Sequence, residues 1–101
     1  MIVLHASFPI DPDRLEEALS LVGGLVEASN REDGVIDYRA ATDVQDGTVV
    51  RFFEQYADEA AFETHAQSEH FAAFQERLPE LLVGAPEVTR FDVAAATELE
   101  V

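Results

Sequence analysis

The sequence predicts an α+β domain built on a four-stranded antiparallel sheet. Short apolar runs at residues 2–9, 35–42, 48–56 and 87–95 are typical of strands, and apolar residues recur at helical spacing between the first two runs. A second helical region separates the last two runs. The chain has 101 residues, of which 48% are hydrophobic, which is the size and apolar content of one domain. We therefore expect one folding unit over residues 1–101.

The first half begins with an apolar run over 2–9, which we interpret as a buried strand. Asp11 is a typical helix N-cap and Pro12 suits the first helical position, so a helix is predicted over about 12–30. Gly23 and Gly24 interrupt its apolar pattern at a cost of about 1 kcal/mol each. We expect these glycines to allow close packing of the helix on the sheet.

Turn signals at Asp33-Gly34 and Asp46-Gly47 delimit the next two strands, over 35–42 and 48–56. Two such runs joined by a short polar loop predict a β-hairpin. The second helical region is expected in two pieces, which begin at the N-caps Asp58 and Ser68. Pro79 ends or kinks the second piece. A last strand is expected over 87–95, followed by a frayed tail over 97–101.

The resulting order, β-α-β-β-α-β, is the ferredoxin-like pattern, in which the helices cover one face of the sheet. The opposite face of a monomeric sheet should be polar. However, both alternating sets of the third strand carry apolar or aromatic side chains, with Phe53 in one and Phe52 and Tyr56 in the other. We therefore expect a homodimer in which two such sheets cover one another.

The charge of the chain excludes two classes of partner. There are 21 acidic and 6 basic residues, for a net charge of −15, and all six basic residues are arginines. A nucleic-acid-binding protein needs a cationic face, and an anionic membrane surface would repel this chain, so we expect neither partner. Acidic excess without lysine resembles the proteins of salt-accumulating halophiles. An acidic protein of ordinary origin is the alternative.

The absence of cysteine excludes disulfides, thiol nucleophiles and thiolate metal sites. The N-terminal apolar run reaches His5 too early for a signal peptide, and no stretch approaches the roughly 18 apolar residues of a membrane span. We expect a cytoplasmic protein.

Three histidines are candidates for proton transfer, because imidazole is the side chain that titrates near neutral pH. His5 lies in an apolar strand, where a hydrogen-bonded core residue is the commoner role. His65 and His70 bracket the predicted cap at Ser68, but their spacing is not that of a helical zinc site and no third ligand is evident. We therefore expect no metal site.

Arginine and tyrosine side chains on the hairpin are further candidates. Arg51 and Arg39 lie on adjacent strands, where a buried ion pair is the first expectation and an anion or oxyanion contact the second. Tyr38 and Tyr56 are either core residues with a satisfied hydroxyl or ligand-binding groups. Because Arg51 and Phe53 alternate with Tyr56 along one strand, not all of these residues can face the same pocket.

One long segment resembles the antibiotic biosynthesis monooxygenase (ABM) domain family. Residues 53–65, FEQYADEAAFETH, followed by the motif SEHF at 68–71, match the family's aromatic-Glu-x-aromatic strand end, alanine-rich short helix ending in His, and Ser-x-His-Phe. Residues 32–38, EDGVIDY, resemble its Glu-x-Gly-x-x-x-Tyr segment. The likeness extends over nearly the whole chain. Tyr56 stands where the family usually has tryptophan.

The resemblance implies a dimeric α+β barrel of two ferredoxin-like subunits, with a pocket between sheet and helices in each. It also implies a monooxygenase that uses no metal, flavin or haem and that oxidises a small quinol-like or polyphenolic aromatic with O2. On this basis His65 is expected to be the base or an orienting group and His5 a second catalytic polar group. The substrate-binding candidates are Tyr38, Arg51, Phe53, Tyr56 and His70.

A related group of the same fold degrades haem, but the chain departs from its pattern at three positions, His5, His65 and Gln75, so we expect no haem. Two other functions stay open. The same pocket suits isomerisation of a small carbonyl metabolite, or a non-catalytic dimer that binds an apolar metabolite. Each of the three interpretations requires an apolar hollow under the short helices that encloses the imidazole of His65.

Overall fold

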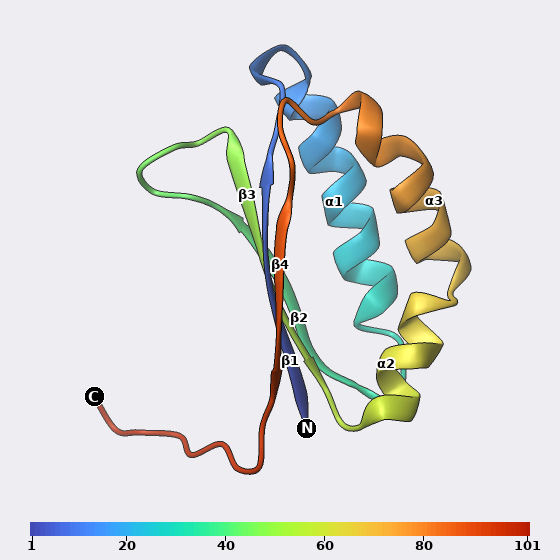
Figure 1. Ribbon diagram of the computed structural model, residues 1–101, viewed down its shortest axis with the longest axis vertical. Coiled ribbons are helices and arrows are strands. Elements are labelled where there is room, and N and C mark those ends of the chain that lie inside the picture. The colour runs from blue at the N-terminus through green and yellow to red at the C-terminus, as the bar shows by residue number, and fades with distance from the viewer.

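A computed structural model describes all 101 residues and confirms the predicted α+β, ferredoxin-like fold. Four strands form one antiparallel sheet in the order β2-β3-β1-β4. They span Ile2–Pro9 (β1), Val35–Thr42 (β2), Val49–Tyr56 (β3) and Glu87–Asp92 (β4). The α-helices lie together on one side of this sheet, whereas the β2–β3 loop and the C-terminal tail project away from them (Figure 1).

The first helical segment begins as its sequence indicates. Asp11 caps it by accepting a hydrogen bond from the backbone N–H of Asp13, at 3.0 Å. A 3-10 turn, Pro12–Arg14, leads into α1, Leu15–Ser29, so the predicted helix over 12–30 starts as a tighter turn. At the other end, the Asn30 side chain donates to the backbone oxygens of Val26 and Tyr38. This residue therefore ties the end of α1 to the strand that carries Tyr38.

The second helical region is divided as predicted, into α2, Glu59–Ala66, and α3, Glu69–Arg77. The side chain of Asp58 accepts from the N–H of Ala61, and that of Ser68 accepts from the N–H of Phe71. A 3-10 turn over Leu78–Glu80 contains Pro79, so the α-helix ends just before the proline. None of the helices combines the length and the apolar character that a membrane-spanning helix requires.

The core lies between the helices and one face of the sheet. Alternate residues of β1 and β3 point into it, and Phe8, Phe52 and Phe74 meet there in edge-to-face contacts with ring centroids 5.2–6.1 Å apart. β4 is exposed along its whole length and ends at Asp92, three residues before the predicted end. The tail from Ala95 onward has no regular secondary structure.

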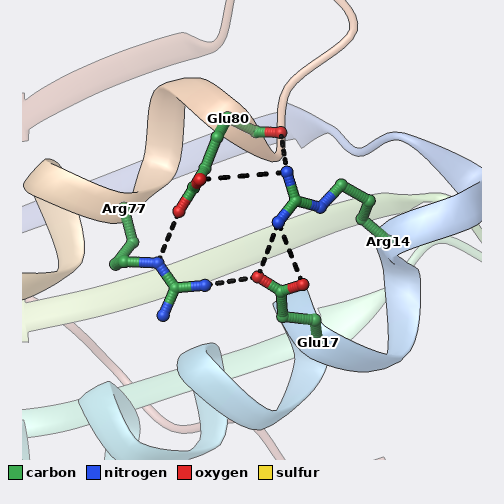
Figure 2. A network of polar contacts seen from close by, with 4 residues as sticks. All are labelled: Arg14, Glu17, Arg77 and Glu80. Carbon is green, nitrogen blue, oxygen red and sulfur yellow. Dashed lines mark hydrogen bonds and ion pairs between the residues drawn. The ribbon is translucent and has the colours of Figure 1, made fainter.

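A four-residue ion-pair network joins the first turn of α1 to the end of α3. Arg14 pairs with Glu17 and Glu80, and Arg77 pairs with the same two acids from the other side (Figure 2). All four side chains are between a third and a half exposed, so each pair contributes at most about 1 kcal/mol. The network fixes the relative position of the two helix ends more than it stabilises the chain.

The glycines of α1 do not pack closely on the sheet, so that expectation is wrong. A Cβ atom added at Gly23 or Gly24 would meet no atom within 4 Å. Gly34 behaves differently, because a Cβ atom there would lie 2.3 Å from the Cβ of Ala61 in α2. The α1–β2 loop can therefore approach α2 closely because residue 34 is glycine. Neither glycine of α1 is required by the packing around it.

Substituting Gly24→Ala should stabilise the protein by about 1 kcal/mol, because alanine removes the helix-propensity penalty without a clash. Gly34→Ala is the matched control and should destabilise it, since the loop must move away from α2. Urea denaturation of both variants measures the two free energies. Destabilisation by Gly24→Ala would mean that the helix needs its glycines.

Candidate functional site

The candidate site centres on the buried imidazole of His65 at the end of α2. Its exposed fraction is 2%, and its ring lies between aromatic side chains of three other elements. The ring centroids of Phe71, Tyr38 and Tyr56 are 5.0, 5.1 and 5.4 Å from that of His65. His65 faces the sheet because it follows the Asp58 cap by two helical turns, on the side of α2 that meets β3.

A carboxylate from the α1–β2 loop contacts both histidines of this region. One oxygen of Glu32, Oε2, is 2.8 Å from Nδ1 of His65 and 2.7 Å from Nε2 of His70. An ionised carboxylate only accepts hydrogen bonds, so both ring nitrogens donate to it. Neutral His65 therefore carries its proton on Nδ1 and has a lone pair on Nε2.

Two chain features hold these three side chains together. Close contact between Gly34 and Ala61 brings the loop of Glu32 against α2. At the junction of α2 and α3, the Ser68 hydroxyl donates to the backbone oxygen of His65, at 2.7 Å, and so fixes the corner between the two histidines.

Two buried polar atoms of the cluster have no hydrogen-bond partner: Nε2 of His65 and Oε1 of Glu32. Burial lowers the pKa of His65, because removal from water disfavours the imidazolium form, while Glu32 acts in the opposite direction. The ring is thus a neutral base whose free nitrogen is shielded from water. Unpaired buried polar atoms are costly in a structure and often mark positions where a ligand binds.

A second buried polar group lies on β3. Glu54 accepts a hydrogen bond of 2.5 Å from the hydroxyl of Tyr56, and the Tyr38 hydroxyl approaches the same carboxyl. Burial raises the pKa of Glu54, because removal from water disfavours the ionised carboxylate, while the hydrogen bonds from the two tyrosines act in the opposite direction. It also raises the pKa of both tyrosines, whose hydroxyls stay protonated next to this acid.

The apolar hollow expected around His65 is occupied by side chains. Of the rings around it, Tyr38 packs edge to face on Phe52, and Tyr56 packs edge to face on Phe62. Two open, polar hollows reach the cluster from the surface, and Glu32 and Thr64 line both. One, of about 470 Å³, lies over Gly34 and Ala61; the other, of about 560 Å³, includes His70.

Three of the predicted site residues lie on the opposite face of the sheet. His5, Arg51 and Phe53 point away from the helices, and His5 is paired with Phe53 across β1 and β3. Arg51 is 44% exposed and pairs with Asp43, at 2.6 Å, so it forms the expected ion pair but is not buried. His5 is exposed and is not the core residue that its strand suggested.

The structure therefore brings together His65, His70, Tyr38 and Tyr56 but separates them from the other three candidates. It adds Glu32 and Glu54, to which the sequence analysis gave no role. The Glu-x-Gly spacing at 32–34 was the available signal for Glu32, because the glycine is what permits its approach to α2.

Comparisons with known proteins agree with one another. A protein-family model described as "Antibiotic biosynthesis monooxygenase" matches residues 1–77. The Bacillus subtilis protein named "Putative monooxygenase YcnE" is 33% identical over 94 residues, covering 93% of this chain and 99% of its own. The crystal structure of PA3566 from Pseudomonas aeruginosa is 28% identical, with a TM-score of 0.84 and coverage of 93% and 94%. Rv0793 from Mycobacterium tuberculosis, 23% identical with a TM-score of 0.89 and coverage of 96% and 98%, shares the fold.

The substitution Glu54→Gln should remove the loss of folding stability that the buried acid causes as the pH rises. An acid whose pKa is raised by folding loses its proton at a lower pH in the unfolded chain than in the folded chain. Its contribution to the free energy of unfolding is therefore present below the ordinary glutamate pKa, about 4.3, and is lost as the pH rises above that value. The stability of the variant relative to the original protein should therefore increase as the pH rises from about 4 to 7.

Urea denaturation at several pH values measures this difference, and a variant in which Tyr56 is changed to Phe controls for loss of the hydrogen bond alone. A difference that does not change with pH would show that Glu54 is ionised in the folded protein.

Proposed function

Because the chain belongs to the antibiotic biosynthesis monooxygenase family, we propose that it oxidises a small quinol-like or polyphenolic aromatic with O2, with Glu32 and His65 as its base. The observation that supports this most is the imidazole of His65, which is buried, held by a carboxylate at Nδ1 and unpartnered at Nε2. A carboxylate–imidazole pair of this kind is a general base, with the acid fixing the tautomer and stabilising the imidazolium that forms.

In the proposed reaction, Nε2 of His65 removes a proton from a phenolic hydroxyl or an activated C–H group of the substrate. Glu32 offsets the charge of the imidazolium, which burial otherwise disfavours. The electron-rich anion reduces O2 directly. One oxygen atom is inserted at a ring carbon and the other leaves as water, so a hydroquinone becomes a hydroxyquinone. The substrate supplies all four electrons, and neither an external reductant nor a cofactor is needed.

The substrate requires space that aromatic side chains now fill. Phe71 is only partly buried, at the start of α3, and its ring is the one nearest to His65. We propose that a flat aromatic substrate displaces Phe71 and takes its place against the imidazole, with Tyr38 and Tyr56 as the remaining walls. The hollow lined by His70 and Glu32 adjoins this position and offers an entrance.

Replacing His65→Gln should lower the rate of oxidation by a factor of about 10² to 10⁴, the usual contribution of a general base. Oxygen uptake with a panel of hydroquinones and polyphenols measures this rate. His5→Gln is the matched control and should leave the rate unchanged, since His5 lies on the other face of the sheet.

Equal rates for both variants would rule out His65 as the base. No oxygen uptake with any substrate would instead favour the isomerase, if a carbonyl metabolite is converted, or the non-catalytic binding protein, if a ligand is recovered unchanged.

We further propose that the chain works as a homodimer in which the outer faces of two sheets pack together. Phe53 and Phe91 remain 42% and 49% exposed on this face, separated by Val3 and His5 of β1. Exposed aromatic groups on one face of a sheet favour burial against a partner surface. His5, Phe53 and Arg51 would then belong to the subunit interface and not to the pocket around His65.

Phe53→Arg should convert the dimer into a monomer, because it replaces an exposed aromatic side chain of the outer face by a charge beside Arg39, its partner on β2. Leu19→Arg is the matched control, since Leu19 is equally exposed, at 40%, but lies on α1. Size-exclusion chromatography with light scattering measures the molecular mass of each variant at a working salt concentration. A monomeric original protein, or a dimeric Phe53→Arg variant, would contradict the proposed interface.

We also propose that the chain functions in a salt-rich cytoplasm, as in a salt-accumulating halophile. Every arginine is paired with at least one acidic side chain, and most of the acidic residues are left without a cationic partner. Mutual repulsion among these carboxylates destabilises the compact state in dilute buffer, and salt screens it.

The melting temperature should therefore rise between about 0.05 and 2 M NaCl, over which the screening length falls from over 10 Å to below about 3 Å. Differential scanning fluorimetry follows this transition, and sucrose, which does not screen charge, is the control solute. A melting temperature that does not change over this range of salt would contradict the halophilic origin.

A further inference from the structure

The cluster that holds His65 also has the composition of a metal site. The Oε2 atom of Glu32, Nδ1 of His65 and Nε2 of His70 all lie within 4.8 Å of one another. We propose that these three side chains bind a divalent transition-metal ion such as Zn²⁺ or Co²⁺. The histidine spacing gave no indication of this site in the sequence, because the third ligand comes from a loop more than thirty residues away.

The charge of the cluster favours a cation. Glu32 is 13% exposed, its only ion-pair partners are the two histidines, and its Oε1 atom has no partner at all. Neighbouring Arg31 points elsewhere and pairs with Glu27. No arginine pairs with Glu32, and a carboxylate in a largely buried position is costly unless its charge is compensated. A bound divalent ion would neutralise it and give Oε1 a second position from which to coordinate.

The donor types select the class of metal. Two imidazole nitrogens and one carboxylate are ligands that suit zinc, cobalt, nickel, copper and iron, whereas calcium and magnesium prefer oxygen ligands throughout. Three protein ligands also leave room for a water molecule in a fourth position. The hollow lined by Thr64, Gln67 and Ser68 adjoins Glu32 and His70, and His70 is itself 28% exposed, so an ion and its water can enter from solvent.

Metal binding requires the three side chains to shift locally. The present oxygen–nitrogen distances of 2.7 and 2.8 Å are those of hydrogen bonds to one shared oxygen. Metal–ligand distances near 2.1 Å in a tetrahedral site separate the ligands by roughly 3.4 Å, so each oxygen–nitrogen distance would widen by about 0.6 to 0.7 Å. The two histidine nitrogens, which lie within 4.8 Å of one another, would take up the same separation. The ion would take the place of the two N–H protons whose hydrogen bonds Glu32 now accepts. Ser68 and Gly34 keep the backbone of the three ligands in position throughout.

Metal binding has a consequence that rests on the proposed function. When Nδ1 of His65 coordinates an ion, the remaining ring proton of the neutral imidazole must be on Nε2, which can then no longer act as a base. The metal would inhibit the proposed oxidation and would not be its cofactor.

Binding can be measured without any substrate. Chelator-treated protein is titrated with Zn²⁺ by calorimetry and with Co²⁺ by visible absorption, in the presence of excess Mg²⁺ to occupy the acidic surface. We expect one saturable site per chain with a dissociation constant in the micromolar range or tighter, and a Co²⁺ spectrum typical of tetrahedral coordination. Glu32→Gln and His70→Gln should each weaken binding at least tenfold, whereas His5→Gln should not.

His70→Gln keeps the test valid if Glu32→Gln impairs folding, because His70 is the most exposed ligand; thermal melting checks both variants. The absence of a saturable site, or the same affinity in His70→Gln as in the original protein, would overturn the proposal. A comparable loss in His5→Gln would also overturn it, since the ions would then be bound elsewhere. These results do not depend on oxygen uptake, so failure of the metal site and failure of the proposed oxidation are distinguishable.

Discussion

The hydrogen bonds from two imidazoles to one oxygen of Glu32 connect the fold of this chain to its chemistry. They join the α1–β2 loop to the adjoining ends of α2 and α3. They also determine which nitrogen of His65 carries the proton, and so leave a lone pair inside an aromatic enclosure. Without Glu32 the ring would be a buried histidine with no fixed tautomer and no counter-charge for its protonated form.

Much of the fold was predictable because its boundary signals are local. The caps at Asp11, Asp58 and Ser68 are made by hydrogen bonds within three residues, and β1 and β2 have the predicted bounds. β4 ends three residues earlier than predicted. Asp92 is its last residue paired with β1, opposite Ile2, and the chain leaves the sheet after one further backbone hydrogen bond, from the N–H of Val93 to the oxygen of Met1. This end depends on pairing with a strand that is distant in sequence.

The candidate site was less predictable because it depends on contacts distant in sequence. His65 was identified from its motif, but its partner Glu32 is brought to it by the absence of a side chain at Gly34. Strand alternation separated Arg51 and Phe53 from Tyr56 correctly, and the same alternation with the β1–β3 register places His5 beside Phe53. The size of the enclosure could not be predicted, since it depends on how the rings of Tyr38, Phe52 and Phe71 pack.

Three states of the cluster have been described: the hydrogen-bonded one, the one that receives the substrate's proton in the proposed reaction, and the proposed metal complex. In each of them Nδ1 of His65 faces Glu32. The state of that nitrogen is therefore the central claim. Two-dimensional ¹H–¹⁵N NMR spectra of imidazole side chains report it directly, in metal-free protein at neutral pH. We expect His65 to be the Nδ1–H tautomer with an unprotonated Nε2, and this preference to be lost in Glu32→Gln. An Nε2–H tautomer in the original protein, or an unchanged spectrum in the variant, would contradict the account.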